Sequence, residues 1–204
     1  MSDHPPSSGA IADPSPPQPE AIPAPLKCCS LAWFAAVSFV AVLYLLDQAT
    51  KLWTAGLDFG RPGWPVLRQH LALGDHIEVA PNWFHWVHFS NTGAAFGVLQ
   101  DSNRFFIGLS VVALLGLSWA LKRNIFPGRL NLAAVLLLIS GILGNFTDRL
   151  IHGYVVDFLY FDLGFPPFNP WPAFNVADSC ICVAVVLLFL ASFQDMRKSN
   201  PAKP

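Results

Sequence analysis

The chain contains few charged residues. Asp, Glu, Lys and Arg together make up 12% of its 204 residues, whereas hydrophobic residues make up 53%. A soluble domain usually carries about a quarter charged residues, so this composition argues against a protein with a fully hydrated surface. The formal net charge is −1, and no basic stripe offers a surface for nucleic acid. We therefore expect a membrane protein without a nucleic-acid partner.

Cysteine is also scarce, with four residues in two close pairs. Cys28 and Cys29 are adjacent. Cys180 and Cys182 are two residues apart in an apolar run, where a helix would point them in different directions. Neither pair has the spacing of a disulfide framework or a zinc site. We expect no metal site at these cysteines.

Long apolar runs, by contrast, are present, and they set the fold class. About 20 apolar residues cross the ~30 Å hydrocarbon core of a bilayer as a helix. The sequence therefore predicts an all-α membrane protein with four transmembrane helices, with Asp47 and Gln48 at the outer boundary of the first. The four runs are Leu31–Leu46, Phe105–Leu121, Leu130–Phe146 and Val176–Phe193.

The distribution of Lys and Arg predicts the topology. Basic residues flank the second and third runs at Lys122, Arg123 and Arg129, whereas residues 150–175 contain no Lys or Arg. The positive-inside rule then places both termini in the cytoplasm and the loops 52–104 and 150–175 on the outer side of the membrane. Residues 1–26 are rich in proline and are expected to form a disordered tail. Residues 27–196 would form the membrane domain, followed by a second tail at 197–204.

The first outer loop carries two segments rich in Val, Ile and aromatic residues. His76–Ala80 and Trp83–Ser90 both have β-type composition, with glycine and proline around them. We expect a small extracytoplasmic β-sheet between spans one and two, presenting aromatic side chains to lipid or substrate. His85 and His88 suggest a zinc site, but their spacing puts them on opposite faces of a strand and no third ligand is evident.

Two aspartates, Asp157 and Asp178, lie in strongly apolar sequence. A charge at the centre of a bilayer costs about 2.5–3.5 kcal/mol, so an acid within a membrane segment is by default a candidate functional residue. If the two carboxylates face each other, one keeps a proton and the pair titrates as a unit. Such a pair suits peptide hydrolysis, in which one member activates water and the other polarises the carbonyl.

The two acids are expected to differ in charge. Asn175 is a candidate N-cap for the fourth helix, with Asp178 three residues later as in a capping box. The positive end of that helix favours a negative Asp178, so Asp157 is the expected proton holder. Simpler alternatives are a capping role alone for Asp178 and an ion pair with Arg149 for Asp157. Gly153 is expected to break the third helix, so that residues 155–160 run extended.

Five sequence blocks also match a known family in the family's order. The chain resembles the lipoprotein signal peptidases (signal peptidase II), which are bacterial inner-membrane aspartic peptidases, from about residue 31 to residue 193. The blocks are Asp47-Gln-Ala-Thr-Lys51, Asn91-Thr-Gly-Ala-Ala-Phe-Gly97, Gly144-Asn-Phe-Thr-Asp-Arg149, Val155-Val-Asp-Phe158 and Phe174-Asn-Val-Ala-Asp-Ser179. One departure is Ser140-Gly-Ile-Leu before Gly144, where the family commonly has a Gly-Gly pair, and helix packing there is expected to differ.

The resemblance implies an activity. Asp157 and Asp178 would be the catalytic pair of an endopeptidase that cleaves prolipoproteins before a diacylglyceryl-modified cysteine. It would need no cofactor, and the cyclic peptide globomycin would inhibit it. We expect a monomer in contact with membrane lipid.

The resemblance also implies supporting roles for other residues. Asn91 and Arg149 are expected to hold the substrate backbone, and Asn145 and Asn175 to support the site. Asp47 and Lys51 would form a salt bridge at the end of the first helix or contact the substrate. Other matching or candidate positions are Gly93, Asp148 and Phe96, with Phe96 closing over the site together with Trp83, Phe84 and Trp86.

Three other classes of function remain as alternatives. A proton-coupled transporter would also use paired acids, but it would favour internal repeats, and none is evident. A non-catalytic lipid-binding relative would be expected to lack one of the aspartates. A Ser/Lys peptidase would need Ser179 to meet Lys51.

Overall fold

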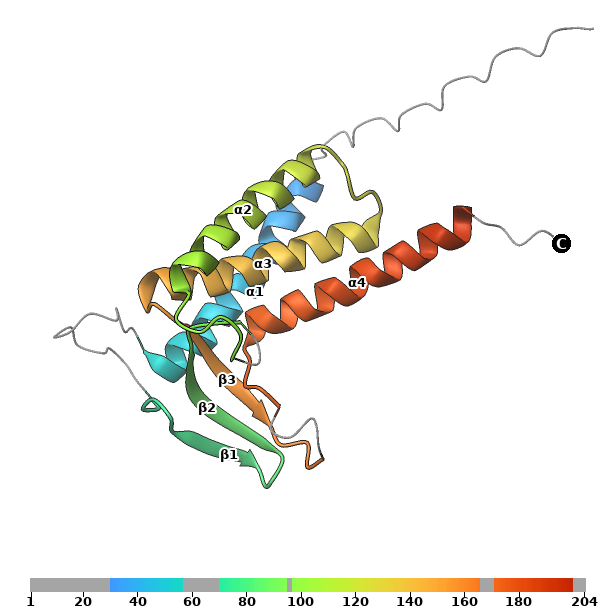
Figure 1. Ribbon diagram of the computed structural model, residues 1–204. Coiled ribbons are helices and arrows are strands. Elements are labelled where there is room, and N and C mark those ends of the chain that lie inside the picture. The colour runs from blue at the N-terminus through green and yellow to red at the C-terminus, as the bar shows by residue number, and fades with distance from the viewer. Residues whose placement is uncertain (1–29, 57–69, 95–96, 166–170, 200–204) are drawn as a thin grey trace, which may run out of the picture.

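The computed structural model describes residues 30–56, 70–94, 97–165 and 171–199. Four helices, α1 (Ser30–Ala55), α2 (Asn103–Lys122), α3 (Arg129–Ile151) and α4 (Val176–Ser199), dominate the fold (Figure 1). Each contains a segment that is long and apolar enough to cross a membrane. The predicted four-helix membrane architecture is therefore confirmed.

The first helix is longer than its apolar run. It continues through Asp47 and Gln48 to Ala55, so these polar residues do not mark its outer boundary as predicted. Asp47 and Lys51 are buried. The helix can carry them because α3 and α4 supply polar partners for both residues.

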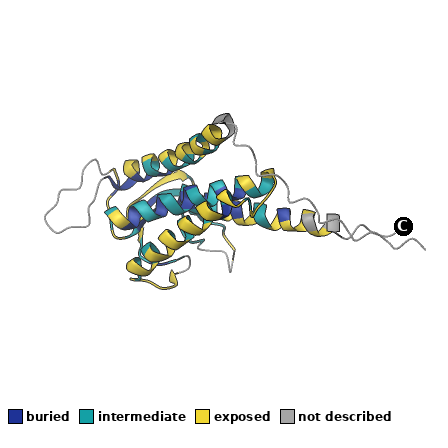
Figure 2. Ribbon diagram, turned by 90° about the horizontal axis from the view of Figure 1, so that it is seen from above, coloured by how far each residue is buried: buried dark blue, intermediate teal, exposed yellow. Residues whose placement is uncertain are grey.

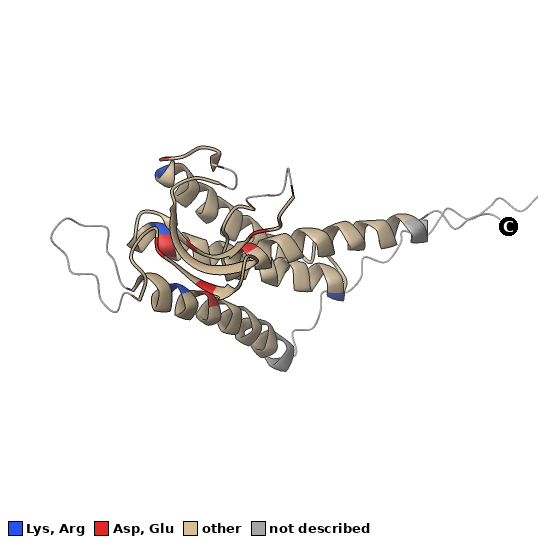
Figure 3. Cartoon of the chain, turned by 90° about the horizontal axis from the view of Figure 1, so that it is seen from below, with Lys and Arg blue, Asp and Glu red and all other residues tan. Residues whose placement is uncertain are grey.

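Helix α3 lies at the centre of the bundle and contacts each of the other three helices. Its inner face is buried, while α1, α2 and the later part of α4 expose large apolar side chains (Figure 2). In Figure 3 the helices are tan along most of their length, as expected for surfaces that face lipid. The buried polar residues of α3, Asn145, Asp148 and Arg149, lie in its last two turns.

Small residues let α3 approach its neighbours closely. A Cβ on Gly141 would lie 2.5 Å from the carbonyl oxygen of Ala177, and one on Gly144 would lie 2.5 Å from Oδ2 of Asp47. Ala177 itself is buried at the start of α4. Although the expected Gly-Gly pair is absent, Gly141 and Gly144 provide close contacts to α4 and α1, as small residues do in membrane bundles.

A three-stranded antiparallel sheet lies beyond one end of the helices (Figure 1). The strands β1 (His76–Ala80) and β2 (Phe84–Asn91) come from the predicted segments of the first outer loop. The third strand, β3 (Val155–Phe161), comes from the chain between α3 and α4 and pairs with β2. The sheet was expected between spans one and two only, so its third strand extends that prediction.

A break after α3 allows β3 to form. The helix ends at Ile151, and Gly153 has a φ of +84°, a conformation that glycine adopts without steric cost. The chain then turns and enters β3 at Val155. The predicted break is confirmed, and Asp148 and Asp157 belong to different elements.

The sheet is anchored to the end of α1. The indole of Trp86 donates to Oγ1 of Thr54 at 2.8 Å and stacks on Phe158. His88 is buried, and its Nδ1 lies 2.9 Å from the carbonyl oxygen of Leu71. Over the residues that the structure describes, no group of three or more His, Cys, Asp or Glu side chains is placed to hold a metal ion.

Candidate active site

Asp157 and Asp178 lie on either side of Asn175. Asp157 is buried in the middle of β3, and Asp178 lies in the first turn of α4. Nδ2 of Asn175 donates to Oδ1 of Asp157 at 2.8 Å, and Oδ1 of Asn175 accepts the backbone N–H of Asp178 at 2.9 Å. The Asn175 side chain therefore contacts both acidic residues.

The predicted capping box is confirmed. The backbone N–H of Asn175 donates to Oδ2 of Asp178 at 3.3 Å, in return for the bond that Asp178 gives to Asn175. Asn175 is fully buried. The cap fixes the start of α4 and the side chain of Asp178 at the same time.

Asn91, the last residue of β2, holds Asp157 from the other side. Its Nδ2 donates to Oδ2 of Asp157 at 3.1 Å, and its Oδ1 accepts the N–H of Gly93 at 3.0 Å. A Cβ on Gly93 would lie 2.5 Å from the carbonyl oxygen of Val98, so this tight loop requires glycine. Asp157 receives its two hydrogen bonds from asparagines, and the alternative of an ion pair with Arg149 is wrong.

Asn145 connects Asp178 to a buried lysine. Nδ2 of Asn145 donates to Oδ1 of Asp178 at 2.8 Å, and its Oδ1 accepts from Nζ of Lys51 at 3.0 Å. The residue lies on α3 and is buried. A continuous chain of polar contacts thus runs from the first helix to the fourth.

Lys51 is paired with two carboxylates. Its Nζ lies 2.8 Å from Oδ2 of Asp47 and 2.9 Å from Oδ2 of Asp148, and its side chain is only 3% exposed. Asp47 also accepts the N–H of Ala177 at the start of α4, and Asp148 accepts the N–H of Val156. The salt-bridge alternative for Asp47 and Lys51 is confirmed, and the pair is buried in the last turns of α1.

Arg149 holds the loop that carries Gly93. Its Nη2 donates to the carbonyl oxygen of Gly93 at 2.9 Å, and its guanidinium lies 4.8 Å from the ring centroid of Phe106. The residue is largely buried. A contact with substrate backbone remains a prediction for Arg149, as it does for Asn91.

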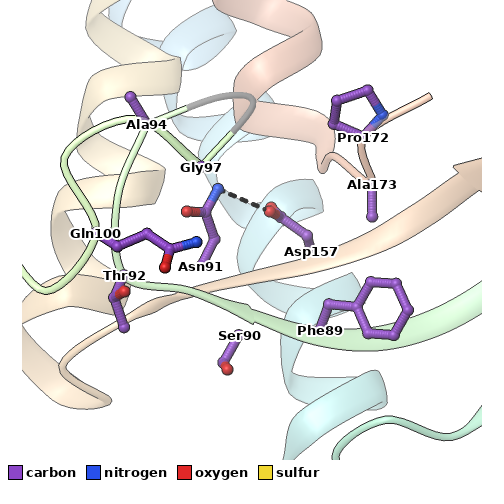
Figure 4. A pocket seen from close by; sticks show the side chains of 10 residues that line it. All are labelled: Phe89, Ser90, Asn91, Thr92, Ala94, Gly97, Gln100, Asp157, Pro172 and Ala173. Atoms are coloured by element: carbon purple, nitrogen blue, oxygen red, sulfur yellow. Dashed lines mark hydrogen bonds between the residues drawn. The ribbon is translucent and has the colours of Figure 1, made fainter. Parts of the chain in front are cut away.

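Asp157 faces an open cavity of about 340 Å³ (Figure 4). Polar side chains from β2 and the following loop line one side, and apolar side chains line the other. Asn91 and Asp157 meet in the middle of this lining, joined by their hydrogen bond. The lining residues are Phe89, Ser90, Asn91, Thr92, Ala94, Gly97, Gln100, Asp157, Pro172 and Ala173.

The surroundings of Asp157 favour its neutral form. Burial and the nearby charge of Asp178 raise the pKa of Asp157 to about 8, against the opposing effects of Asn91, Lys51 and Asn175. Asp157 is therefore mostly protonated at neutral pH and loses its proton as the pH rises through about 8. The expectation that Asp157, and not Asp178, holds the proton stays a prediction.

Comparison with known proteins assigns the family. A family model described as signal peptidase (SPase) II matches residues 39–194. The chain belongs to the signal peptidase II family. It is 37% identical to the lipoprotein signal peptidase of Psychromonas ingrahamii over 157 residues, which cover 75% of this chain and 81% of that protein. It is 38% identical to that of Syntrophotalea carbinolica over 169 residues, covering 81% and 95%.

Solved structures share the fold. One described as a bacterial membrane enzyme at 2.3 Å resolution matches with a TM-score of 0.69 and 26% identity, covering 84% of this chain and 94% of the other. A second, at 1.9 Å resolution, matches with a TM-score of 0.64 and 28% identity, covering 79% and 94%. The chain is a multi-pass membrane peptidase of the signal peptidase II family.

The aromatic residues expected to close over this peptidase site have different surroundings. Phe84 stacks on Phe161, and Trp86 stacks on Phe158, so both rings pack within the sheet region. Trp83 is 54% exposed and is available to lipid or substrate. Phe96 lies outside the described residues.

The sequence did not lead us to expect a role in the site for two residues, Gln48 and Phe106. Gln48 donates to Asp47, Asp148 and the carbonyl oxygen of Gly144, and Phe106 packs on the guanidinium of Arg149. The adjacency of Gln48 to Asp47 in an apolar run was a signal that more than one polar group is buried there. Nothing in the local sequence distinguishes Phe106 from Phe105, the other phenylalanine of α2.

Proposed function

We propose that this peptidase removes the signal peptide from prolipoproteins, cleaving before a diacylglyceryl-modified cysteine, with Asp157 and Asp178 as its acid–base pair. The proposal goes beyond family membership in naming the substrate and the catalytic residues. The observation that carries it is the bridge made by Asn175, which contacts both acidic residues through one fully buried side chain. The names of the curated relatives support lipoproteins as the substrate.

The proposed reaction follows from the different protonation of the two acids. Ionised Asp178 takes a proton from a water molecule, whose oxygen bonds to the carbonyl carbon of the scissile peptide. Neutral Asp157 donates its proton to the carbonyl oxygen. In the collapse of this tetrahedral intermediate one hydroxyl returns its proton to Asp157 as the carbonyl reforms, the C–N bond breaks, and the leaving cysteine nitrogen takes its proton from Asp178. Proton gain and loss balance over one turnover.

The proposed site suits a substrate that stays in the membrane. The cavity beside Asp157 is lined by residues of β2, β3, the loop after β2 and the segment before α4 (Figure 4). Acyl chains of the modified cysteine would remain in lipid while the peptide enters this cavity. The distribution of Lys and Arg supports an active site near the outer face and cytoplasmic termini. We propose a monomer that needs no cofactor and is blocked by globomycin.

The Ser/Lys alternative receives no support from the contacts of its two candidate residues. Oγ of Ser179 donates to the carbonyl oxygen of Asn175 at 2.9 Å. Nζ of Lys51 is held by Asp47, Asp148 and Asn145. Neither side chain is placed to activate the other.

The test is cleavage of a diacylglyceryl-modified prolipoprotein by the purified full-length protein. Asp157→Asn and Asp178→Asn are each expected to lower kcat/KM by about 10³-fold, within the range for loss of general acid–base catalysis. Asp75→Asn, which changes an exposed carboxylate outside the cavity, is the matched control and should cleave normally.

The two parts of the proposal fail in different ways. If a folded parent protein never cleaves the modified substrate, the substrate assignment is wrong. If either Asn variant retains normal cleavage, the wrong carboxylates have been chosen. Globomycin should block the parent, and a substrate whose cysteine carries no lipid should not be cleaved.

A further inference from the structure

We propose that Lys51 is a positioning residue for the peptidase reaction, because its ammonium fixes which way round the Asn145 amide lies beside Asp178. The inference rests on the proposed function, in that it takes Asp157 and Asp178 as the acid–base pair. It adds a role for a buried cation that has no contact with the cavity lining. Lys51 touches neither acid. Beyond the through-space effect of its charge on both of them, it would act on the reaction through Asn145.

The ammonium of Lys51 has three N–H donors and three acceptors. They are Oδ2 of Asp47 at 2.8 Å, Oδ2 of Asp148 at 2.9 Å and Oδ1 of Asn145 at 3.0 Å. An ammonium cannot accept a hydrogen bond. Asn145 must therefore present its oxygen, not its NH₂ group, to Lys51.

The other end of the amide is fixed as a consequence. With its oxygen facing Lys51, Asn145 presents Nδ2 to Oδ1 of Asp178 at 2.8 Å. An ionised carboxylate accepts this bond well, because it has only acceptor sites. If the amide were reversed, Oδ1 of Asn145 would face Oδ1 of Asp178. That contact would be favourable only if Asp178 carried a proton. The observed orientation therefore favours the ionised form of Asp178.

The amides on the Asp157 side are oriented differently. Asn91 is fixed by the backbone N–H of Gly93, and Asn175 by the backbone N–H of Asp178. Both of these donors are neutral, whereas Oδ1 of Asn145 accepts from the Lys51 cation at 3.0 Å as well as from the neutral Nδ2 of Asn175 at 3.2 Å. The difference in charge between the two acids then comes partly from Lys51. Charged groups on the elements around Asp178 are Lys51 and Asp47 of α1, Asp148 and Arg149 of α3, and Asp157 of β3.

A purely structural role is the competing explanation. The ion pair of Lys51 with Asp148 joins α1 to α3, and its loss would destabilise the bundle without any effect on the chemistry of the remaining folded protein. The two roles differ in the pH dependence of cleavage. They also differ in whether the effect of Lys51 requires Asn145.

The experiment is a double-mutant cycle on the full-length protein, with Lys51→Met, Asn145→Leu and the double variant. kcat and KM for the diacylglyceryl-modified substrate are measured across pH. Lys51→Met is expected to lower kcat by roughly tenfold or more, with little change in KM. The low-pH limb of the profile, where the ionised acid gains a proton, should move up by about one pH unit. In the Asn145→Leu background, loss of Lys51 should lower kcat much less than it does in the parent.

A charge-balanced variant covers the case in which Lys51→Met does not fold. Lys51→Met with Asp148→Asn removes one positive and one negative charge, so the buried network keeps its net charge. Its low-pH limb is compared with that of Asp148→Asn alone, and the same upward shift is expected. Tyr44→Phe is the control for the α1–α3 interface, because it removes only the contact of the Tyr44 hydroxyl with Thr147 at 3.2 Å; its profile should be that of the parent.

Three results would overturn the role of Lys51. They are a low-pH limb unchanged in the variants that lack Lys51, effects on kcat that add in the double variant, and a limb unchanged in Asn145→Leu. The last of these is decisive even if both Lys51 variants unfold, because Asn145→Leu retains both ion pairs of Lys51. Failure of the proposed function looks different: the parent would not cleave, or Asp157→Asn or Asp178→Asn would remain active.

Discussion

Asp157 and Asp178 are identical side chains carried by different kinds of element. Asp157 lies on a β-strand beside the cavity and accepts two hydrogen bonds from neutral asparagine side chains. Asp178 lies in the first turn of a helix and accepts from Asn145, which is itself held by a cation. The strand and the helix thus give two identical side chains different electrostatic surroundings, and this difference is the basis of the proposal that Asp157 is neutral and Asp178 ionised.

The largest expected effect comes from breaking the link between the two acids. Asn175→Ala removes the donor to Asp157 and the N-cap of α4 together. We expect kcat/KM to fall by about a hundredfold or more and the free energy of unfolding to fall by about 1 kcal/mol through loss of the cap. Cleavage kinetics and detergent unfolding measure the two effects.

Asn175→Ser is the matched variant for this prediction. Serine can still cap the helix but cannot replace the NH₂ group that reaches Asp157. It should retain most of the stability and lose the activity. Normal kcat/KM in Asn175→Ser would show that the donor to Asp157 is not needed.

A second substitution disturbs the polar network that leads to Asp178 and leaves the hydrogen bonds of Asp157 in place. Gly144→Ala would place a Cβ 2.5 Å from Oδ2 of Asp47, and such overpacking typically costs about 1–3 kcal/mol. Gly108→Ala on α2 is the control, since a Cβ there meets nothing within 4 Å. Equal unfolding free energies for the two variants would mean that the close contact of α1 with α3 is unimportant.

The smallest expected effect concerns the protonation of Asp157. Because its pKa is raised to about 8, kcat/KM should fall as the pH rises through about 8. The hydrogen bond from Asn91 lowers the pKa of Asp157, so Asn91→Leu should move this limb to higher pH, by about half to one unit. A pH profile without a high-pH limb, or a limb that moves down in Asn91→Leu, would contradict the assignment.

Much of the fold could be predicted because its signals are local. The apolar runs, the β-type segments, the break at Gly153 and the capping box of Asn175 with Asp178 each depend on residues close together in sequence. The pairing of Phe89 with Asp157 in the sheet is different. It joins strands from two separate loops, and no local pattern encodes that register.

The buried ion pair was harder to interpret for a similar reason. Asp47 and Lys51 are four residues apart, which suits an exposed pair on a helix surface as well as a buried one. Their burial depends on Asp148 and on the N–H of Ala177, which approach from α3 and α4. The sequence therefore predicted the salt bridge but not its position within the polar network.

The central claim is that Asp157 is neutral while Asp178 is ionised, and infrared spectroscopy of the resting protein tests it most directly. A protonated carboxyl group gives a carbonyl band that a carboxylate lacks. We predict such a band at neutral pH that is lost as the pH rises through about 8 and is absent from Asp157→Asn. A band that persists unchanged in Asp157→Asn and disappears in Asp178→Asn would contradict the account.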